Sequence, residues 1–550
     1  MDAFAGALQW KTSMAIKADA LPEWLIRMRA VDPEKAVIGR IIDLKGERNG
    51  ARVFLRMCGK EVTYAELAEN SRRAAGGFQK LGISKGDKVA IILPNQPEYL
   101  YSWFGLCHLG AVMVPVNTAL KGEGLQFILD HSDACAVIVH ERFWPLLQAI
   151  YSGLNKVKHL VYQREKEENG APALKEAILW EDFIESSPDF SPIDLRGSDP
   201  SQILYTSGTT GRPKGVIIPH ARSITTGVRL ASISRCTHAD TLYTALPLFH
   251  VNAQHVTAWA AIMADAGMAM SERFSASRYW QETREFRATR VSFLGSTMAI
   301  LYNQPRKPDD AENPVEIAMS AGTPAGIWEA FEKRFGLRIL EYYGTSEGGF
   351  LLNEIGGKIG SMGRETPLYQ ARIFAPEDKE APNGQVGELV FRPPQGSRLI
   401  EYYKNPSATA EKVKGGWLHS GDMAYRDEDG YFFFVDRKND YIRRRGENIS
   451  SADIERVVNS HPAVLESAAV AVPSEVGEDD VKVLLVLRPG ARLALEELIS
   501  YCEERMAYFM VPRYLEFRDS LPKTTTEKVM KESLKLEGVS SRTWDRGKLK

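Results

Sequence analysis

Short apolar runs alternate with helical stretches over the first third of the chain. Lys88–Leu93 (KVAIIL), Gly110–Val116 (GAVMVPV) and Ala134–Val139 are bounded by turn residues, which is typical of buried strands. A helical stretch over Glu98–Leu109 separates the first two of these runs. Because strands and helices that alternate at this spacing form crossover units, the pattern predicts an α/β domain with a parallel sheet.

One helix in this region has a recognisable start. Thr63 is followed three residues later by Glu66, which is the spacing of a capping box, and the helix is expected to end near Gly82. Residues 1 to about 50 show only an amphipathic patch around Trp24–Met28, and we read them as a leader without further assignment.

A second, smaller domain is predicted near the C-terminus. The apolar run Tyr431–Val435 (YFFFV) gives way abruptly to the charged segment Asp436–Arg445 (DRKNDYIRRR), which indicates a domain boundary. The residues that follow alternate between predicted helices and strands, over Ala452–Ser460, Ser467–Val472, Lys482–Leu487 and Ala494–Met506.

The length of the chain agrees with two domains, because 550 residues exceed what one hydrophobic core ordinarily serves. We expect a large N-terminal domain over residues 1–436, built of α/β subdomains and a β-rich part, and a small mobile α+β domain over residues 437–550. The basic segment Arg542–Lys550 is expected to be a solvated tail.

Composition narrows the functional classes. The chain has 69 basic and 71 acidic residues, so its near-zero net charge argues against a dedicated nucleic-acid surface. Its five cysteines are scattered without a CxxC pair and fit neither a disulfide framework nor a zinc site. No apolar run approaches the roughly 18 residues of a membrane span, and no secretory signal is recognisable. We therefore expect a cytoplasmic protein.

The most informative stretch is Tyr205–Gly215 (YTSGTTGRPKG), which follows an apolar run. Glycines let a backbone expose its N–H groups, and hydroxyl side chains and Lys214 add donors and charge, as a loop that wraps a polyphosphate requires. Lys214 is followed by Gly215 and not by Ser or Thr, so the loop is not a Walker motif. The alternative interpretation is a flexible surface loop.

This stretch resembles the phosphate loop of the adenylate-forming superfamily, which includes acyl-CoA synthetases, firefly-type luciferases and peptide-synthetase adenylation domains. The resemblance extends from about residue 60 to residue 535, with the motifs in the order of the family. It implies a carboxylate activated with ATP and release of pyrophosphate. The residues that it assigns to the phosphates are Thr206, Ser207, Gly208, Thr209, Thr210, Gly211 and Lys214.

A histidine motif follows the loop. In the resembled family, the motif at Pro247–Val251 (PLFHV) lines the acyl pocket, and His250 helps to gate access to it. A histidine alone at such a position is more often a packed or capping residue. Asn252 and His255 could line the same pocket, although Asn252 is more simply explained as a helix N-cap.

Two glycine-containing motifs, SAGTP and YYGTSEGG, come next. A lone glutamate in a glycine-rich loop is usually just solvated. By resemblance, however, Glu347 is a Mg²⁺ ligand, helped by Thr206. Such an ion takes few protein ligands besides phosphate oxygens. The resemblance also implies that Tyr343 stacks on adenine. It places the other contacts to the adenylate and the acyl group at Gly322, Thr323, Gly344 and Ser346.

The motif Trp417–Asp422 (WLHSGD) ends in a carboxylate that resembles the ribose ligand of the family. An aspartate after a glycine is also a common turn choice, so a structural role remains an alternative. By the same resemblance, Arg437 holds the ribose as well.

The small domain contributes the remaining parts. By resemblance, Asn439 is the hinge about which this domain swings, although the family usually has Asp or Lys there, and Gly446 lets the pantetheine arm of coenzyme A pass. Arginines 443–445 would lie near that path or form a solvated face. Lys528 matches the terminal catalytic lysine, which would bridge the carboxylate and the α-phosphate. Glu527 stands where the family has glycine.

The implied activity is that of an ATP-dependent acid–CoA ligase, with ATP, Mg²⁺ and coenzyme A as cofactor and co-substrates and a small carboxylic acid as the partner. The run Gly430–Ser450 and the PLFHV motif are most similar to crotonobetaine/carnitine–CoA ligases and related bacterial acyl-CoA ligases. The alternatives are an adenylation enzyme that loads a separate carrier protein, a luciferase-type oxygenase, and a degenerate nucleotide-binding or scaffold protein.

Overall fold

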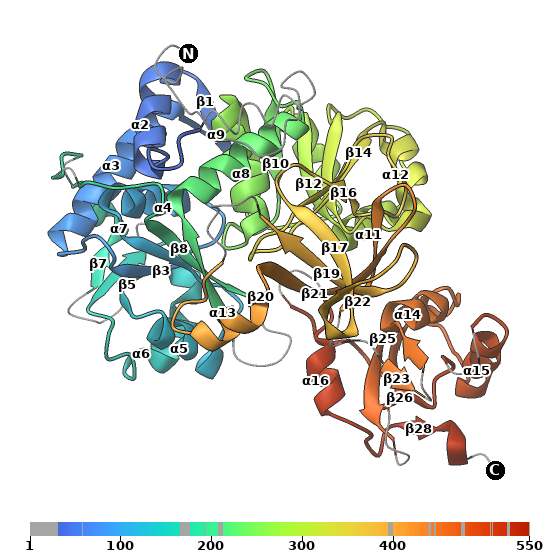
Figure 1. The fold of residues 1–550 in the computed structure, drawn as a ribbon. Helices are drawn as coiled ribbons and strands as arrows, with labels where there is room; N and C mark the ends of the chain where they lie inside the picture. Colours follow the sequence, from blue (N-terminus) through green and yellow to red (C-terminus); the bar gives the residue numbers. More distant parts are fainter. Residues whose placement is uncertain are drawn as a thin grey trace.

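The computed structural model describes residues 31–548, except 58, 166–176, 187, 192, 207–212, 394–399, 438–439, 441, 445–446, 475–478, 507, 509 and 525–527. Two large sheets and a small C-terminal domain make up the described chain (Figure 1).

The first sheet confirms the predicted parallel arrangement. Its strand order is β7-β6-β5-β3-β4-β8-β9, and β3 pairs in parallel with both β4 and β5. The strands are β3 (Lys88–Ile92), β4 (Val112–Pro115), β5 (Ala134–His140), β6 (His159–Gln163), β7 (Ala177–Leu179), β8 (Pro200–Thr206) and β9 (Lys214–Pro219). The helices α5 (Gly122–His131), α6 (Trp144–Tyr151) and α7 (Trp180–Ile184) connect or flank them.

The second sheet joins a parallel part to an antiparallel part. Its parallel core runs through β11 (Gly267–Met270), β10 (Thr241–Thr244), β12 (Arg290–Leu294), β13 (Ile317–Ala321) and β14 (Arg338–Tyr343), with β1 (Val53–Met57) and β2 (Lys60–Thr63) at one edge. The associated helices are α9 (Ala260–Ala264), α10 (Tyr279–Glu285), α11 (Gly295–Tyr302) and α12 (Trp328–Phe335).

The antiparallel part is the predicted β-rich region. It comprises β15 (Leu351–Asn353), β16 (Gly363–Glu365), β17 (Gln370–Ala375), β18 (Lys379–Glu380), β19 (Gly387–Arg392), β20 (Val413–Lys414), β21 (Trp417–Arg426) and β22 (Tyr431–Arg437), with α13 (Pro406–Lys412) before β20. In Figure 1 these gold strands form the part of the second sheet that lies next to the small domain.

Helices fill the space between the two sheets. The helices α3 (Tyr64–Lys80), α4 (Pro97–Leu109) and α8 (His220–Ile233) share one hydrophobic core with strands of both sheets. The predicted capping box is confirmed, because the backbone N–H of Thr63 donates to Glu66 at 2.7 Å and the Thr63 side chain accepts from the Glu66 backbone. The reading of residues 1 to about 50 as a leader is wrong for its last part, since α2 (Ile38–Asn49) packs into this core.

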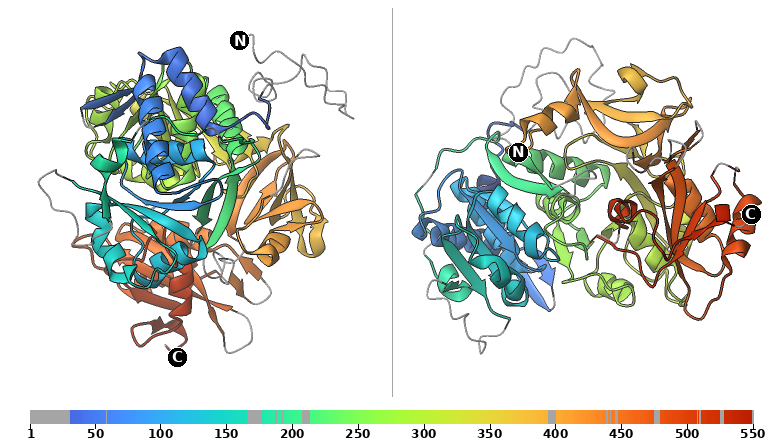
Figure 2. Two further views of the ribbon diagram at one scale, coloured as in Figure 1. Left: turned by 90° about the vertical axis from the view of Figure 1, so that its left-hand side faces the viewer. Right: turned by 90° about the horizontal axis from the view of Figure 1, so that it is seen from below.

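The small domain is the predicted α+β unit. Its sheet contains β25 (Val464–Pro473), β26 (Asp479–Leu487), β27 (Tyr514–Phe517) and β28 (Trp544–Asp545), and its helices are α14 (Ser451–Asn459), α15 (Leu495–Glu503) and α16 (Lys531–Leu536). The hairpin of β23 (Ile442–Arg444) and β24 (Glu447–Ile449) precedes them. Figure 2 shows this red domain beside the gold strands in both views.

The expectation of a solvated C-terminal tail is wrong. Strand β28 pairs antiparallel with β27, and Asp545 forms an ion pair with Arg513 at 3.2 Å. A second ion pair joins Arg546 to Glu503 of α15 at 3.1 Å. Strand pairing and these two ion pairs therefore attach the described part of this segment to the small domain.

Candidate active site

The predicted phosphate loop connects two strands of one hairpin. Strands β8 and β9 pair antiparallel, and their last register pair joins Thr206 to Lys214. The ladder ends there, so the residues at both ends of the loop are fixed by the sheet. The loop residues Ser207, Gly208, Thr209, Thr210 and Gly211 lie outside the described residues.

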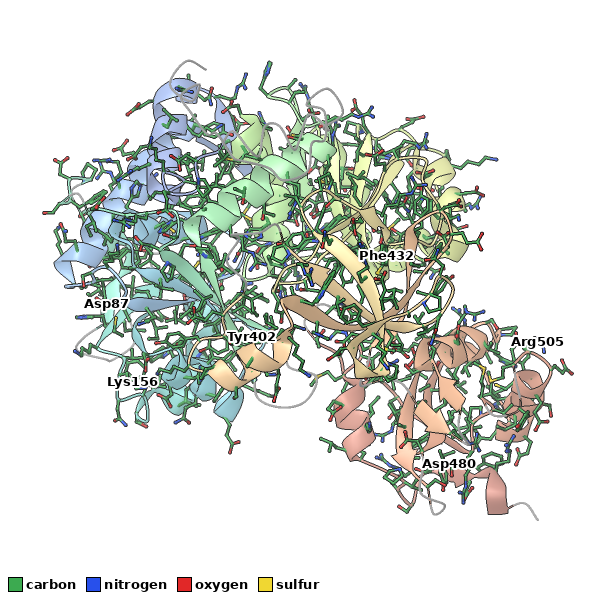
Figure 3. All side chains as sticks on the ribbon, in the orientation of Figure 1. Asp87, Lys156, Tyr402, Phe432, Asp480 and Arg505 are labelled. Carbon is green, nitrogen blue, oxygen red and sulfur yellow. The ribbon has the colours of Figure 1, made fainter. Side chains whose placement is uncertain are left out.

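The predicted metal ligand Glu347 lies in the same neighbourhood. The hydroxyl of Tyr402 donates to Glu347 Oε1 at 2.8 Å, and the Lys214 ammonium lies 5.6 Å from the centre of the Tyr402 ring. Tyr402 also forms a β-bridge with Val216 of β9, at the junction visible in Figure 3. The loop hairpin and the glutamate motif, about 130 residues apart in sequence, are thus joined through Tyr402, which the sequence analysis missed.

Burial and the charge of Glu347 raise the pKa of Tyr402, so its phenol remains a neutral donor. The second oxygen of Glu347 makes no hydrogen bond to a described residue. Within the described ranges, no group of three or more His, Cys, Asp or Glu side chains could hold a metal ion. An ion at Glu347 would therefore depend on substrate oxygens for most of its ligands.

Three residues predicted to bind the nucleoside lie together. Asp422 on β21 is the register partner of Arg437 on β22, and their side chains approach to 3.6 Å. The hydroxyl of Tyr343, at the end of β14, donates to Asp422 Oδ2 at 2.5 Å. The Tyr343 ring stacks on Phe391 at 5.8 Å between centroids, which fixes its orientation. The sheet therefore assembles an aromatic ring, a carboxylate and a guanidinium side by side.

A buried glutamate supports the loop after β13. Glu341 accepts hydrogen bonds from the Gly322 backbone at 2.6 Å and from the Thr323 hydroxyl at 2.5 Å. Burial raises the pKa of Glu341 to about 7, although these hydrogen bonds act in the opposite direction. Gly322 has φ = +80°, a conformation that favours glycine. Glu341 thus holds both residues that were predicted to border the adenylate.

Lys528 reaches the large domain from the small one. Its pKa is lowered by the surrounding protein and by Arg437, and Asp422 partly offsets this effect. Lys528 in turn helps burial to lower the pKa of His250 to about 4. The side chain of Lys528 is exposed to solvent. Lys528 is therefore close enough to interact electrostatically with Asp422 and Arg437 on one hand and with His250 on the other.

Two hydrogen bonds between Lys528 and Thr524 stabilise the turn that carries Lys528. The backbone N–H of Lys528 donates to the Thr524 hydroxyl at 3.2 Å, and the Lys528 carbonyl accepts from the Thr524 N–H at 2.7 Å. Glu527, together with the predicted hinge Asn439 and Gly446, lies outside the described residues.

Two sequence-based interpretations are wrong. Asn252 is not an N-cap: it lies within the π-helix η3 (Asn252–Trp259), and its Nδ2 donates to the Tyr342 hydroxyl at 3.1 Å. Arg444 is not part of a solvated face, because it is buried and forms an ion pair with Asp480 at 3.0 Å. Asp480 lies in the interior of the small domain (Figure 3).

The other predicted residues lie on nearby loops. Ser346 accepts a hydrogen bond at its carbonyl from Arg222 of α8 at 2.6 Å, and Gly344 follows directly after β14. His255 is buried in η3, where its Nε2 is 3.2 Å from the Ser223 hydroxyl. The contact between His255 and Ser223 joins η3 to α8.

Comparison with known families agrees with this geometry. A model of the AMP-binding enzyme family matches residues 43–400, and a model of the AMP-binding enzyme C-terminal domain matches residues 453–528. The chain belongs to the AMP-binding enzyme family. The resemblance to the adenylate-forming superfamily seen in the motifs is thereby confirmed.

Individual members of the AMP-binding enzyme family are similar over most of the chain. Crotonobetaine/carnitine–CoA ligases of Salmonella paratyphi A and Escherichia coli O7:K1 are each 34% identical, over 86% of this chain and 93% of theirs. The crystal structure of the anthranilate CoA ligase AuaEII with anthranoyl-AMP matches with a TM-score of 0.82 and 24% identity, over 93% of this chain and 98% of that one.

ATP-bound MatB from Rhodopseudomonas palustris matches with a TM-score of 0.81 and 25% identity, over 91% of this chain and 98% of that one. These similarities confirm the predicted α/β fold with a large N-terminal domain and a smaller C-terminal one. None of the helices that the structure describes is long and apolar enough to cross a membrane.

Proposed function

We propose that this AMP-binding enzyme ligates a carboxylic acid to coenzyme A at the expense of ATP. The observation that carries the proposal is that Lys528 of the small domain is close enough to Asp422 and Arg437 for their charges to act on its pKa; with Tyr343 these two residues form the predicted nucleoside group. The family match and the acid–CoA ligases among the relatives support the same reaction. The reaction has two steps.

The first step forms an acyl-adenylate. A carboxylate oxygen of the acid bonds to the α-phosphorus of ATP, and the bond from that phosphorus to the bridging oxygen breaks, so that pyrophosphate leaves. In this proposal the ammonium of Lys528 neutralises charge on the carboxylate and the α-phosphate. Since its low pKa keeps His250 neutral, that side chain adds no competing cation beside Lys528.

The nucleotide is held by residues of both large sheets. In this proposal Asp422 and Arg437 bind the ribose, Tyr343 stacks on adenine, and Gly322 and Thr323 border the adenine and acyl groups. Gly344 and Ser346 complete this wall. The hairpin loop from Thr206 to Lys214 holds the leaving pyrophosphate, for which a lysine and several hydroxyl groups are suitable donors.

Glu347 and Thr206 are the residues that would hold a Mg²⁺ ion. Only Oε1 of Glu347 accepts a hydrogen bond from a described residue, which leaves the other oxygen to bind the ion. A carboxylate oxygen next to the phosphate loop is the kind of ligand that Mg²⁺ prefers. When bound with ATP, such an ion neutralises the phosphate oxygens. Tyr402 orients the carboxylate for this role.

The second step transfers the acyl group. We propose that the domain after residue 436 rotates about Asn439, which withdraws Lys528 and brings Gly446 to the adenylate. The sulfur of coenzyme A then bonds to the acyl carbon, the bond from that carbon to the AMP oxygen breaks, and the thiol proton is lost. ATP and coenzyme A are both available in the cytoplasm, where we propose that the enzyme acts.

A panel of carboxylic acids assayed for pyrophosphate and AMP, with and without coenzyme A, tests this proposal. We expect at least one acid to give pyrophosphate and AMP together with an acyl-CoA product, and sustained turnover only when coenzyme A is present. AMP release that does not depend on coenzyme A would favour loading of a separate carrier protein. No ATP turnover with any acid would contradict the proposal.

A further inference from the structure

A cation without an acidic partner lies near the predicted acyl-binding residues. Arg229 of α8 places its guanidinium carbon 4.2 Å from the centre of the Phe350 ring. Its Nε nitrogen is shielded from water and makes no hydrogen bond to any residue that the structure describes. Among the residues that the structure describes, no carboxylate forms an ion pair with Arg229 or with its neighbour Arg222.

The charge of Arg229 is retained at neutral pH. Burial lowers the pKa of Arg229 to about 10, which still leaves the guanidinium protonated. The charge of Arg222 acts in the same direction. Taking a charged group out of water is expensive unless it is paired and hydrogen-bonded. Arg229 is thus a half-buried cation with a shielded Nε, and among the described residues no carboxylate pairs with it.

The side chains around Arg229 supply no negative charge. Tyr342 and Tyr369 are close enough to affect its pKa, and burial raises the pKa of Tyr342, so that phenol is neutral. His255 is close enough to be affected by both arginines, and its pKa is lowered to about 3 by burial and by their charges. The local charge is therefore that of two guanidinium groups.

Arg229 is connected to the predicted acyl side of the site. Tyr342 directly precedes Tyr343, its ring stacks with Phe350, and its hydroxyl accepts from Asn252 Nδ2 at 3.1 Å. The Asn252 Oδ1 is buried and has no hydrogen-bond partner in the described part of the chain. Asn252 and Arg229, each with a buried polar atom that makes no hydrogen bond to a described residue, are therefore both close to Tyr342.

We propose that Arg229 binds a second anionic group of the acid, so that the substrate is a dicarboxylic acid of which one carboxylate is adenylated. This inference rests on the ligase function proposed above and names its substrate class. The planar guanidinium fork matches a carboxylate, and charge-assisted bonds of this kind are about twice as strong as neutral ones. The distal carboxylate provides the missing partner of Arg229.

The same arrangement disfavours a betaine. A quaternary ammonium group is ordinarily bound over the face of an aromatic ring. Here the face of Phe350 is already covered by the Arg229 guanidinium, which would also repel a like charge. Carnitine, which the names of the relatives at 34% identity include, is therefore expected to be a poor substrate for this chain.

Pyrophosphate release from matched acids tests the substrate class. The probes are a series of linear dicarboxylic acids, the monomethyl ester of each, and L-carnitine. We expect the best dicarboxylate to exceed its own monomethyl ester about 30-fold or more in kcat/KM, and carnitine to give little turnover. Better turnover of the esters or of carnitine would overturn the inference and leave the ligase function intact. No turnover of any acid would contradict the ligase function instead.

Substitution of Arg229 separates a binding role from a packing role. Arg229→Gln is expected to lower kcat/KM for the dicarboxylate about 30-fold or more, mainly through KM, and to leave the monomethyl ester within about threefold. The control is Arg235→Gln, an exposed arginine just beyond the end of the same helix with the same change of charge, which should change neither. Equal losses for the diacid and the ester would overturn the inference.

A conservative variant keeps this test informative if Arg229→Gln does not fold. Arg229→Lys retains the charge but not the planar fork, so it should keep the preference for the dicarboxylate with a higher KM. Equilibrium dialysis of a radiolabelled dicarboxylate against the folded variants measures the same preference without turnover. Unchanged binding in the Arg229 variants would overturn the inference.

Discussion

At the residue scale, the site is made of pairs in which sequence motifs supply at least one member. Asp422 and its register partner Arg437 were both predicted from the sequence, and they lie on neighbouring strands. Glu347 also lies in a motif, but its partner Tyr402 comes from a segment without one. Only the folded chain reveals this second partner.

Replacement of Lys528 by alanine should separate the two half-reactions. Because we propose that the ammonium acts where charge develops at the α-phosphate, we expect Lys528→Ala to lower the rate of adenylate formation by about 10²–10³-fold. Thioester formation from a supplied acyl-adenylate should stay close to that of the wild type. Single-turnover assays of each half-reaction measure both rates.

Lys523→Ala is the matched control, since Lys523 carries the same charge in the same segment but pairs with Glu466 of the small domain. It should leave both half-reactions within about twofold. Equal loss of both half-reactions in Lys528→Ala would contradict the role assigned to Lys528.

The role of Tyr402 can be tested through the metal requirement. Tyr402→Phe removes the hydroxyl that orients Glu347, and groups in this position typically change metal affinity 10–100-fold. We expect the Mg²⁺ concentration for half-maximal activity to rise about tenfold, while the fold is kept. Tyr403→Phe is the control, because its hydroxyl bonds to Asp133 and not to Glu347. An unchanged Mg²⁺ dependence in Tyr402→Phe would show that the hydrogen bond has no such role.

Sequence patterns could identify residues only where local chemistry is distinctive. The loop motif and the terminal lysine were visible as unusual combinations of residue types. Glu341 and Arg229 were not, because each is one charged residue of an otherwise ordinary strand or helix. The importance of Glu341 follows from its burial against Gly322 and Thr323, and that of Arg229 from its contact with Phe350, more than 100 residues away.

At the scale of elements, local signals predicted the starts of helices and the course of strands well. The capping box at Thr63 and the strands over Lys88–Ile92 and Ala134–His140 appear where periodicity places them. Two features could not be predicted. No sequence signal distinguishes the wider turns of the π-helix η3 from those of an α-helix. Nothing in the sequence therefore indicates that Asn252 belongs to this helix.

The other unpredicted element is β28, whose composition resembles that of a solvated tail. Its pairing with β27 and the ion pair of Arg513 with Asp545 attach it to the small domain. Tertiary contacts of this kind override a local reading because the partner strand supplies the missing hydrogen bonds.

The capping box of α3 makes a measurable contribution to stability. Thr63→Ala removes one of the two reciprocal hydrogen bonds at the start of a helix that packs between the sheets, so the free energy of unfolding should fall by about 1 kcal/mol. Glu66→Gln retains the capacity to accept from the Thr63 backbone and should lose less. Urea denaturation of both variants measures the difference. Equal stability of Thr63→Ala and the wild type would contradict the capping role.

At the scale of the whole molecule, the neutral histidines between the sheets make stability depend on pH. His220 is fully buried at the start of α8, where its Nδ1 accepts from the Ile38 backbone at 3.3 Å. Burial lowers the pKa of His220 from about 6.5 to about 4.

As the pH falls from about 6.5 to about 4, the unfolded chain takes up a proton that the folded chain does not. The contribution of His220 to stability is therefore complete above about pH 6.5 and is lost over this interval, by up to about 1.4 kcal/mol per pH unit. His220→Gln should flatten the dependence of the free energy of unfolding on pH in this range. His238→Gln, at an exposed position, should not. Parallel curves for His220→Gln and the wild type would contradict this assignment.

The domain arrangement connects the chemistry of distant segments. The hairpin loop, the nucleoside group and Lys528 come from three regions of the chain, and the small domain has to approach the large one for Lys528 to act. A boundary near residue 436 and a rotation about Asn439 remain predictions from the sequence.

Oxygen transfer tests the central claim, acid activation as an acyl-adenylate, most directly. The enzyme is given an acid labelled with ¹⁸O in its carboxylate, together with ATP, Mg²⁺ and coenzyme A, and the products are analysed by mass spectrometry. Since the carboxylate oxygen bonds to the α-phosphorus and stays with it, one ¹⁸O atom should appear in each AMP and none in pyrophosphate. Label in pyrophosphate or inorganic phosphate, or unlabelled AMP alongside labelled acyl-CoA, would contradict the account.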